Sequence, residues 1–248
     1  MPFVLFLVFM IIVISFIIYY EKKRKAYKRD VVDVVLKSYF DDYEYHFEEG
    51  LSKSRVQDTK LVRCGNIYQS DDYIRSSYKG VEFEFSDVRI KKRVKTGKHT
   101  TTITYFSGQW IIIKNKIKLQ APLYVVDRNL SSSMAQNSSL FETSIPKVEL
   151  ESIEFNQEFH VYTNHAHDAF YVLTPDFIEK LIAIHREDVS FYISGEEIHI
   201  AIYSRENLFE PNVFEENTVE AKRDQISKKL DQTLKYIKLF SEGNLWRL

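Results

Sequence analysis

The hydrophobic pattern opens with an apolar run from Pro2 to Tyr20 that contains one serine and no charged residue. A helix of this length spans roughly 28 Å, close to the hydrocarbon thickness of a bilayer. A soluble helix normally buries one face, whereas this run is apolar all round. A secretory signal would have a basic start and small residues at its end, and this segment has neither. The pattern predicts a transmembrane helix over 2–20, with Tyr19 and Tyr20 at the membrane interface.

A basic cluster follows the apolar run directly. It consists of Lys22, Lys23, Arg24, Lys25, Lys28 and Arg29, and no basic residue precedes the run. Because lysine and arginine next to a span prefer the cytoplasmic side, the cluster predicts a single pass with the N-terminus outside. Residues 21–248 are then expected in the cytoplasm. The cluster could also contact anionic headgroups, but setting the orientation is the simpler interpretation.

Beyond this flank, apolar residues recur every three or four positions from Val32 to Phe47. That spacing predicts a helix over 26–49, with Gly50 as its end. We therefore expect residues 21–60 to form the basic flank and a helical stalk between the anchor and the rest of the chain.

From residue 81 the period of the pattern changes to two. Val81, Phe83 and Phe85 alternate with glutamates, as in a half-buried strand. A turn at Thr96 and Gly97 leads into a second run of β-branched and aromatic residues, so a β-hairpin is predicted. The tip of this hairpin is basic, with Lys91, Lys92, Arg93, Lys95 and Lys98. Solvated charges often protect a sheet edge, and a membrane-facing role is the alternative.

The middle of the chain lacks clear periodicity. Residues 129–146 are rich in serine and asparagine and predict a long surface loop, and 122–147 is the expected seam between two possible lobes. After it, the apolar segments 158–163 and 169–174 flank polar residues 164–168. This arrangement predicts a second hairpin.

The last third of the chain mixes helix and strand signals. Thr174 is the expected N-cap of a helix that starts at Pro175. Two strands are predicted around a turn at Gly195, and a closing helix over 218–240 has one apolar face. Antiparallel strands combined with helices, without βαβ units, predict an α+β fold for a domain over 61–248.

Composition narrows the possible functions. Hydrophobic residues make up 44% and aromatic residues 15% of the chain, which indicates a folded protein. The net charge of −1 does not provide the basic surface of a nucleic-acid binder, so no nucleic-acid partner is expected. The single cysteine, Cys64, allows no internal disulfide and is expected to be a small buried side chain. The chain contains no nucleotide-binding or hydrolase motif of the glycine-rich kinds.

Several segments together resemble a known family. They are Tyr45–Ser54, Gly80–Val88, Phe106–Gly108, Val148–Tyr162 and Ala169–Phe177. The chain is similar, over residues 30–215, to a bacterial family of membrane-anchored proteins classified as domain of unknown function number three thousand one hundred and thirty-seven. The resemblance implies bacterial origin and a tethered soluble domain, and it assigns no catalytic residue. Members of the family often have two N-terminal spans, whereas one is predicted here.

The most specific element of the resemblance is E-x-x-x-F-N-x-x-F-x-V, which runs from Glu151 to Val161. Its residues have structural interpretations. Phe155, Phe159 and Val161 suit a core strand, and Asn156 suits a turn or bulge where its side chain satisfies backbone groups.

One cluster has the residue types of a metal site: His160, His165, His167 and Asp168. Imidazoles with a carboxylate bind zinc or non-haem iron. However, polar residues in a short loop need no such explanation, so no catalytic, cofactor or metal site is predicted. The paired acids at Asp41–Asp42, Asp71–Asp72, Glu196–Glu197 and Glu215–Glu216 are expected to be solvated.

These observations favour an interaction or scaffold domain held at a bacterial cell membrane, with the bilayer and a second protein as partners. No catalytic activity and no cofactor are expected. Two alternatives remain open at this point: a metal-dependent hydrolase that uses the histidine cluster, and a lipid-headgroup-binding module that uses the basic hairpin tip.

Overall fold

The computed structural model describes residues 2–114, 117–129, 145–185, 188–205, 207–210 and 218–242. Two compact units emerge from it. The first contains Met1–Asp41 and Phe209–Lys229, and the second contains Asp42–Leu208 and Leu230–Leu248.

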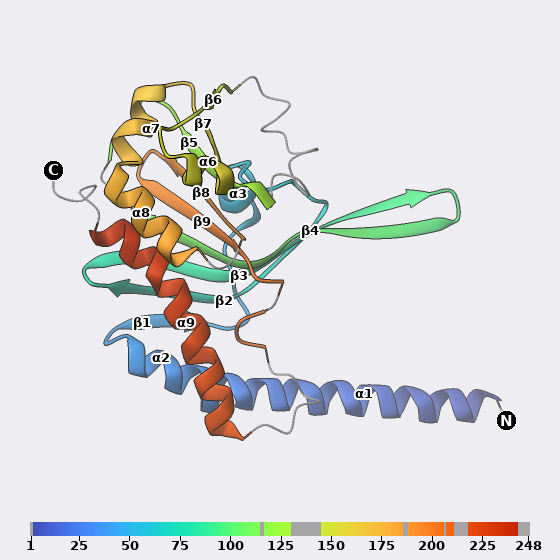
Figure 1. Cartoon of the computed structure of the whole chain (residues 1–248). Coiled ribbons are helices and arrows are strands. Elements are labelled where there is room, and N and C mark those ends of the chain that lie inside the picture. Colours follow the sequence, from blue (N-terminus) through green and yellow to red (C-terminus); the bar gives the residue numbers. More distant parts are fainter. Residues whose placement is uncertain are drawn as a thin grey trace. The chain divides into compact units, whose positions relative to one another are not determined.

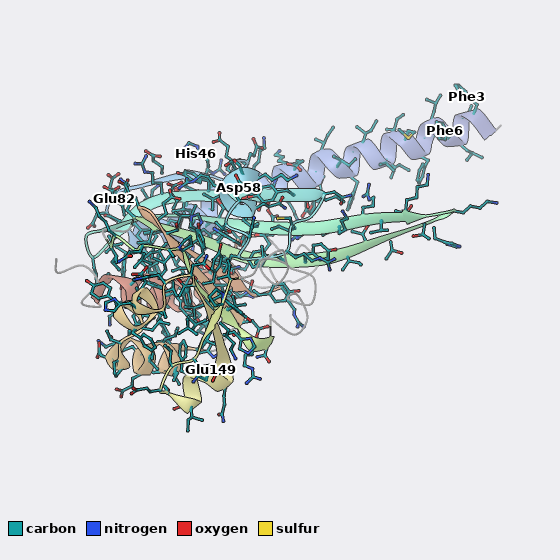
Figure 2. All side chains as sticks on the ribbon, turned by 90° about the horizontal axis from the view of Figure 1, so that it is seen from above. Phe3, Phe6, His46, Asp58, Glu82 and Glu149 are labelled. Carbon is teal, nitrogen blue, oxygen red and sulfur yellow. The ribbon has the colours of Figure 1, made fainter. Side chains whose placement is uncertain are left out.

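The first unit begins with the apolar helix. Helix α1 covers Pro2–Tyr27 and continues through a π-helical turn, η1 (Lys28–Val32), into α2 (Asp33–Tyr39). Its apolar side chains point outward on all sides, as Phe3 and Phe6 illustrate in Figure 2, and they are exposed over nearly the whole run. The helix is long and apolar enough to cross a membrane.

The predicted helix over 26–49 is wrong in its last part. The helix ends at Tyr39, and residues Tyr43–His46 form strand β1, which pairs with β2 (Ile67–Tyr78). Tyr43 and Phe47 continue the four-residue spacing from Tyr39 by coincidence, because residues i and i+4 share a face in a strand as well as in a helix. Strand β2 was not predicted from the sequence, since its residues are mostly polar.

The second unit is built on one antiparallel sheet. Within the described residues, nine strands follow the order β1-β2-β3-β4-β9-β8-β5-β7-β6 (Figure 1). The remaining strands are β3 (Val81–Thr96), β4 (His99–Lys114), β5 (Leu123–Asp127), β6 (Lys147–Val148), β7 (Phe159–Tyr162), β8 (Asp188–Ser194) and β9 (Glu197–Tyr203). The α+β prediction is therefore confirmed.

Helix α8 (Pro175–Ile184) and the part of α9 (Val219–Glu242) from Leu230 onward cover one face of the sheet (Figure 1). The part of α9 that belongs to the second unit places Phe240 against Phe191 of β8, with ring centroids 5.2 Å apart. Phe240 also meets Phe177 of α8 at 5.3 Å. These aromatic contacts close the core on this face.

The other face is covered by the segment around α3 (Lys53–Gln57). Leu51, Val56 and Leu61 pack with Trp110 and Phe106 of β4 in one buried cluster. Because apolar residues cover both faces, the central strands are buried on both sides, and the simple alternation seen at the start of β3 is lost further along the sheet.

Two turns and one helix start follow the predicted chemistry. Gly97 and Gly195 take positive φ angles of 61° and 57° at their hairpin turns. Thr174 accepts a hydrogen bond from the backbone N–H of Phe177 and caps α8. These three predictions are confirmed. The long loop predicted over 129–146 falls almost entirely outside the described residues.

The second predicted hairpin is wrong. After β7, residues Ala166–Val172 form helix α7, so the segment 169–174 is not a strand. The element before β7 is also helical, since α6 covers Ile153–Glu158 and includes Phe155. Short apolar runs do not distinguish a buried helix turn from a strand, and here helix caps decided the outcome.

Candidate functional site

The β3–β4 hairpin extends beyond the sheet (Figure 1). The pairing of β2 with β3 ends at Lys91, and from Arg93 to Thr104 the hairpin side chains are exposed. The side chain of Asn66 takes the place of a further β2 residue, because it accepts from the N–H of Arg93 and donates to its carbonyl. The hairpin is therefore anchored at its base and has two free faces.

The register gives these two faces different chemistry. Lys91, Arg93 and Lys95 lie opposite three threonines of β4, in the pairs Lys91–Thr104, Arg93–Thr102 and Lys95–Thr100. Directly opposite residues of an antiparallel pair share a face, so one face combines three cations with three hydroxyl groups. The other face carries Val94 and Ile103, which are 41% and 47% exposed, together with Lys92 opposite Ile103. The basic face has the groups that bind phosphate or carboxylate.

The four residues of the predicted metal cluster are divided between β7 and α7. His160 lies on β7 and its ring is near the hydroxyl of Tyr162. Asp168 turns inward and accepts hydrogen bonds from the backbone N–H groups of Gln120 and Ala121, at 2.8 and 3.1 Å. Only His165 Nδ1 lies close to it, 3.1 Å from Asp168 Oδ1.

This geometry does not supply a three-ligand centre. Among the described residues, no three of these four side chains bring their ligand atoms together. The ring centroids of His165 and His167 are 6.0 Å apart. The hydrolase alternative required convergence, and the structure does not provide it. Asp168 instead holds the backbone near residue 120.

A polar pocket of about 480 Å³ lies beside β3, with Ser70, Asp87, Arg89 and Asn207 in its lining. Asp87 is buried and accepts hydrogen bonds from the backbone N–H of Leu208, at 2.8 Å, and from the side-chain amide of Gln109. Burial raises the pKa of the Asp87 carboxyl well above its usual range, and the charge of Asp72 adds to this shift. The carboxyl of Asp87 thereby ties β3 to β4 and to the backbone at Leu208.

An ionic network joins α3 to the sheet. The guanidinium of Arg55 donates to Glu84 and to Glu197, both at 2.6 Å. The other oxygen of Glu197 lies 3.1 Å from His199 Nε2. Trp110 donates its indole N–H to His199 Nδ1, and since indole can only donate, the proton of neutral His199 must sit on Nε2.

This network leaves His199 with no nitrogen for a metal or a substrate. Burial lowers the pKa of His199 to about 4, although Glu197 acts in the opposite direction. Sequence reasoning did not find this network, because Arg55, Glu84 and Glu197 are far apart in the chain. Its role is to hold α3 on the sheet.

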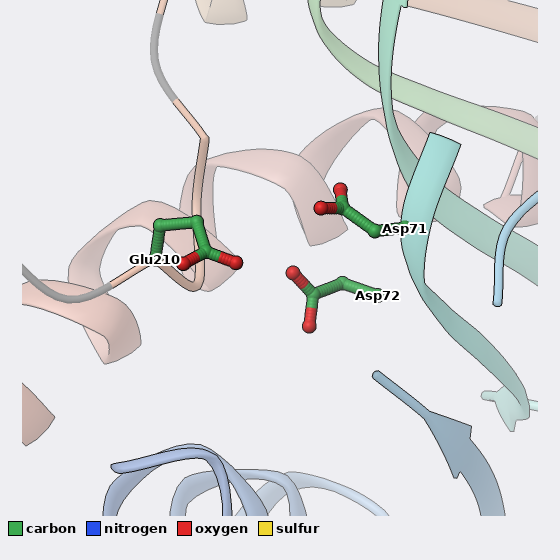
Figure 3. A group of neighbouring side chains, drawn as sticks. All are labelled: Asp71, Asp72 and Glu210. Atoms are coloured by element: carbon green, nitrogen blue, oxygen red, sulfur yellow. The ribbon is translucent and has the colours of Figure 1, made fainter. Parts of the chain in front are cut away.

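Asp71 and Asp72 lie side by side on β2, where the pairing with β3 is irregular (Figure 3). The prediction that this pair is solvated is wrong for Asp72, which is fully buried. Its φ angle of 55° turns the side chain inward, and the hydroxyl of Tyr45 donates to it at 2.6 Å. The cysteine prediction is also wrong, since Cys64 is exposed.

The described residues thus combine a helix that is apolar enough to cross a membrane with an antiparallel sheet domain whose β3–β4 hairpin carries a basic face. A family model described as "Protein of unknown function (DUF3137)" matches residues 104–241. The match covers more than half of the chain, which therefore belongs to the DUF3137 family. The predicted resemblance is confirmed, although the matched range starts and ends later than expected.

No curated protein matches the chain. Among solved structures, the crystal structure of the mycobacterial trehalose monomycolate transport factor A, TtfA, is similar with a TM-score of 0.46 and 12% sequence identity. The alignment covers 88% of this chain and 96% of that chain. At this level of similarity the function of that protein does not transfer to this chain.

Proposed function

We propose that this protein is a single-span anchor that holds an α+β interaction domain at the cytoplasmic surface of a bacterial cell membrane, where the domain binds another protein. The apolar surface of α1 carries the proposal. Phe3, Phe6 and Phe9 are 71%, 59% and 61% exposed, and such a continuous apolar surface is too costly to leave in water. A bilayer is the environment that suits a helix apolar on all sides.

The orientation follows from the basic flank, with one adjustment. Arg24 and Lys28 pair with Glu210 inside the first unit, at 2.8 and 3.2 Å, so their charges are partly balanced within the protein. Lys22, Lys23, Lys25 and Arg29 still place an excess of positive charge on this side of the span. The rule that basic residues stay on the cytoplasmic side then supports an N-terminus outside and the sheet domain inside.

The proposed role in protein binding is supported by the structural roles of the buried polar residues. The ionisable clusters within the second unit, at Asp168, Asp87 and His199, are engaged by protein groups that hold elements together. Meanwhile the β3–β4 hairpin presents exposed side chains on both faces. Binding through exposed strands and grooves is a common way for a tethered domain to hold a partner.

The test is cross-linking in living cells with the intact, anchored chain. A photoreactive amino acid is placed at exposed positions of the second unit, one at a time, and the adducts are identified. The proposal expects one protein to recur in the adducts from neighbouring positions on one face. The same protein should be absent from the adducts formed at positions on an unrelated face. Adducts with no recurrent partner at any position, from a well-expressed chain, would contradict it.

The basic face of the hairpin favours a second candidate function, the binding of anionic lipid headgroups. Each basic residue near an anionic membrane surface contributes about 1 kcal/mol to the free energy of binding. Lys91, Arg93 and Lys95 would therefore together favour binding of the hairpin to such a surface. The threonines opposite them add hydroxyl donors for phosphate oxygens. In this function the hairpin would fix the domain against the bilayer that already holds α1.

A further inference from the structure

An open apolar groove of about 770 Å³ lies on the second unit, between α8 and the segment that leads into α6. Its floor consists of Phe170 and Leu173 from the α7 region together with Ile178 and Ile182 of α8. Phe170 is 52% exposed, which is a high value for a large aromatic side chain. The groove belongs to none of the polar sites described above.

Helix α8 packs one side on the core and borders the groove with the adjacent side, and Ile178, which is 8% exposed, belongs to both. Phe177 and Leu181 are buried in the core, at 3% and 0% exposure. The groove is lined by a second stripe, Pro175, Ile178, Glu179, Ile182 and Ala183. These positions follow the spacing i, i+3, i+4, i+7 and i+8, which marks one continuous helix face. A second stripe of this kind is what another helix packs against.

The opposite wall of the groove is held in place by Asn156. Its side chain accepts from the backbone N–H of Leu150, at 3.2 Å, and donates to the carbonyl of the same residue, at 2.6 Å. The hydroxyl of Ser152 caps α6 by accepting from the N–H of Phe155. The prediction that the Asn156 side chain satisfies backbone groups is thereby confirmed, whereas the predicted turn or bulge is wrong, because Asn156 lies in α6. Since Leu150 and Ser152 line the groove, this wall is formed before any ligand arrives.

The rim of the groove is acidic. Glu151, Glu154 and Glu179 belong to its lining, and within the described part of the chain the lining contains no lysine, arginine or histidine. An anionic lipid or a fatty acid would meet three carboxylates at this rim. A segment with an apolar face and flanking cations would be attracted to it, because its charges complement the rim while its apolar side chains cover the floor.

We propose that this groove binds an amphipathic helix of a partner protein, with the apolar face of that helix along α8 and its lysines or arginines at Glu151, Glu154 and Glu179. The inference rests on the proposed function, since it gives the chemistry of the partner for which the domain is an interaction module. Phe170 provides the exposed aromatic anchor at one end of the groove.

The test uses the full-length chain in nanodiscs of zwitterionic lipid. The probe is a synthetic helix with leucines on one face, lysines at the flanks and a photoreactive group at its centre. A matched peptide with glutamate in place of lysine is the negative probe, and a photoreactive fatty acid is the third. Cross-linked residues are mapped by mass spectrometry, so binding of a peptide to the nanodisc itself does not enter the result.

The groove variant combines Glu151→Lys, Glu154→Lys and Glu179→Lys. The matched control, Glu44→Lys with Glu49→Lys and Glu196→Lys, makes the same charge change at exposed glutamates outside the groove. We expect the lysine peptide to cross-link to groove residues of the wild type and of the control, and at least tenfold less to the groove variant. A further variant, Phe170→Gln, is expected to lose cross-linking without a change in charge.

Cross-links that persist in the groove variant, or that map elsewhere, overturn the proposal. Labelling of the groove by the fatty acid and not by the lysine peptide also overturns it, and identifies an acyl chain as the occupant. Either result leaves the in-cell partner experiment unaffected, because a recurrent partner could bind through the hairpin. Failure of the groove and failure of the interaction function are thus separate outcomes.

Discussion

Arg24 and Glu210 form a two-point ion pair across 186 positions of the chain. The Nε of Arg24 lies 3.0 Å and its Nη2 lies 2.8 Å from Glu210 Oε1. Lys28, which is 1% exposed, lies 3.2 Å from the same oxygen. One carboxylate thus balances two cations of the basic flank, and it secures the segment that precedes α9 to α1 and η1.

Removal of this carboxylate should destabilise the protein. In Glu210→Gln the buried ammonium of Lys28 loses its counter-ion, and we expect a loss of about 2 kcal/mol and a lower melting temperature. Burial acts to raise the pKa of Glu210, but the hydrogen bond from Arg24 and the charge of Lys28 outweigh it, so the pKa is lowered. A lowered carboxylate pKa contributes stability above the ordinary glutamate pKa, and that stability is lost as the pH falls through the folded value.

The measurement is thermal unfolding of the full-length chain in detergent at neutral pH and at acidic pH. The control is Glu220→Gln, an exposed glutamate of the same unit. The difference between Glu210→Gln and wild type should shrink on acidification. An equal melting temperature for both variants at neutral pH would contradict the role of the ion pair.

His199 should make the protein less stable in acid. Its pKa is lowered to about 4 by burial, so the folded state keeps the imidazole neutral while the unfolded chain takes up a proton below about pH 6.5. Between these values the unfolded state binds more protons, and stability falls as the pH falls, by roughly 3 kcal/mol in total. The variant His199→Gln should lose this dependence.

Denaturant unfolding at several pH values between 4 and 7 measures this slope. The control is His46→Gln, which removes an exposed histidine of the same unit. A slope that is unchanged in His199→Gln would show that other groups cause the acid sensitivity.

Gly108 is required by the close approach of β9. A Cβ atom at this position would lie 2.0 Å from the carbonyl oxygen of Ile202, which is backbone and cannot rotate away. Gly108→Ala should therefore cost about 3 kcal/mol or prevent correct pairing of β4 with β9. The comparison is Gly97→Asn, at a hairpin turn with open space and a positive φ that asparagine tolerates. Similar melting temperatures for the two variants would contradict this account.

Much of the fold could be predicted from the sequence, because several elements carry local signals. The apolar run to Tyr20, the glycine turn at Gly97 and the cap at Thr174 each depend on residues next to one another in the chain. The errors have physical reasons. β2 is too polar to be recognised, and Asp72 is buried because a tyrosine hydroxyl from another strand satisfies it.

The sites were less accessible to sequence reasoning. The groove combines α8 with a wall near Leu150 that Asn156 holds in place, and only the hydrogen bonding of Asn156 was predicted. The histidine cluster looked like a metal site because its members are close in sequence, yet Asp168 turns away to bind backbone N–H groups. Closeness along the chain did not produce convergence in space.

The basic hairpin should respond to anionic lipid. In nanodiscs, a fluorophore at Lys98→Cys in a Cys64→Ser background should transfer energy to labelled headgroups more efficiently when the bilayer contains an anionic lipid. The triple variant Lys91→Glu, Arg93→Glu and Lys95→Glu should lose this increase. The control, Lys118→Glu, Lys180→Glu and Lys235→Glu, changes the same charge at exposed lysines elsewhere in the second unit. Equal transfer in both variants would remove the headgroup function.

The orientation of the chain in the membrane is the central claim, and the single cysteine of the protein can be labelled to test it. Cys64 is the single cysteine, and it is exposed. A membrane-impermeant maleimide is added to intact cells and to permeabilised cells, with Pro2→Cys in a Cys64→Ser background as the outward-facing control. The account predicts that Cys64 is labelled only after permeabilisation, whereas the residue-2 cysteine is labelled in intact cells. Labelling of Cys64 in intact cells would place the sheet domain outside and contradict the account.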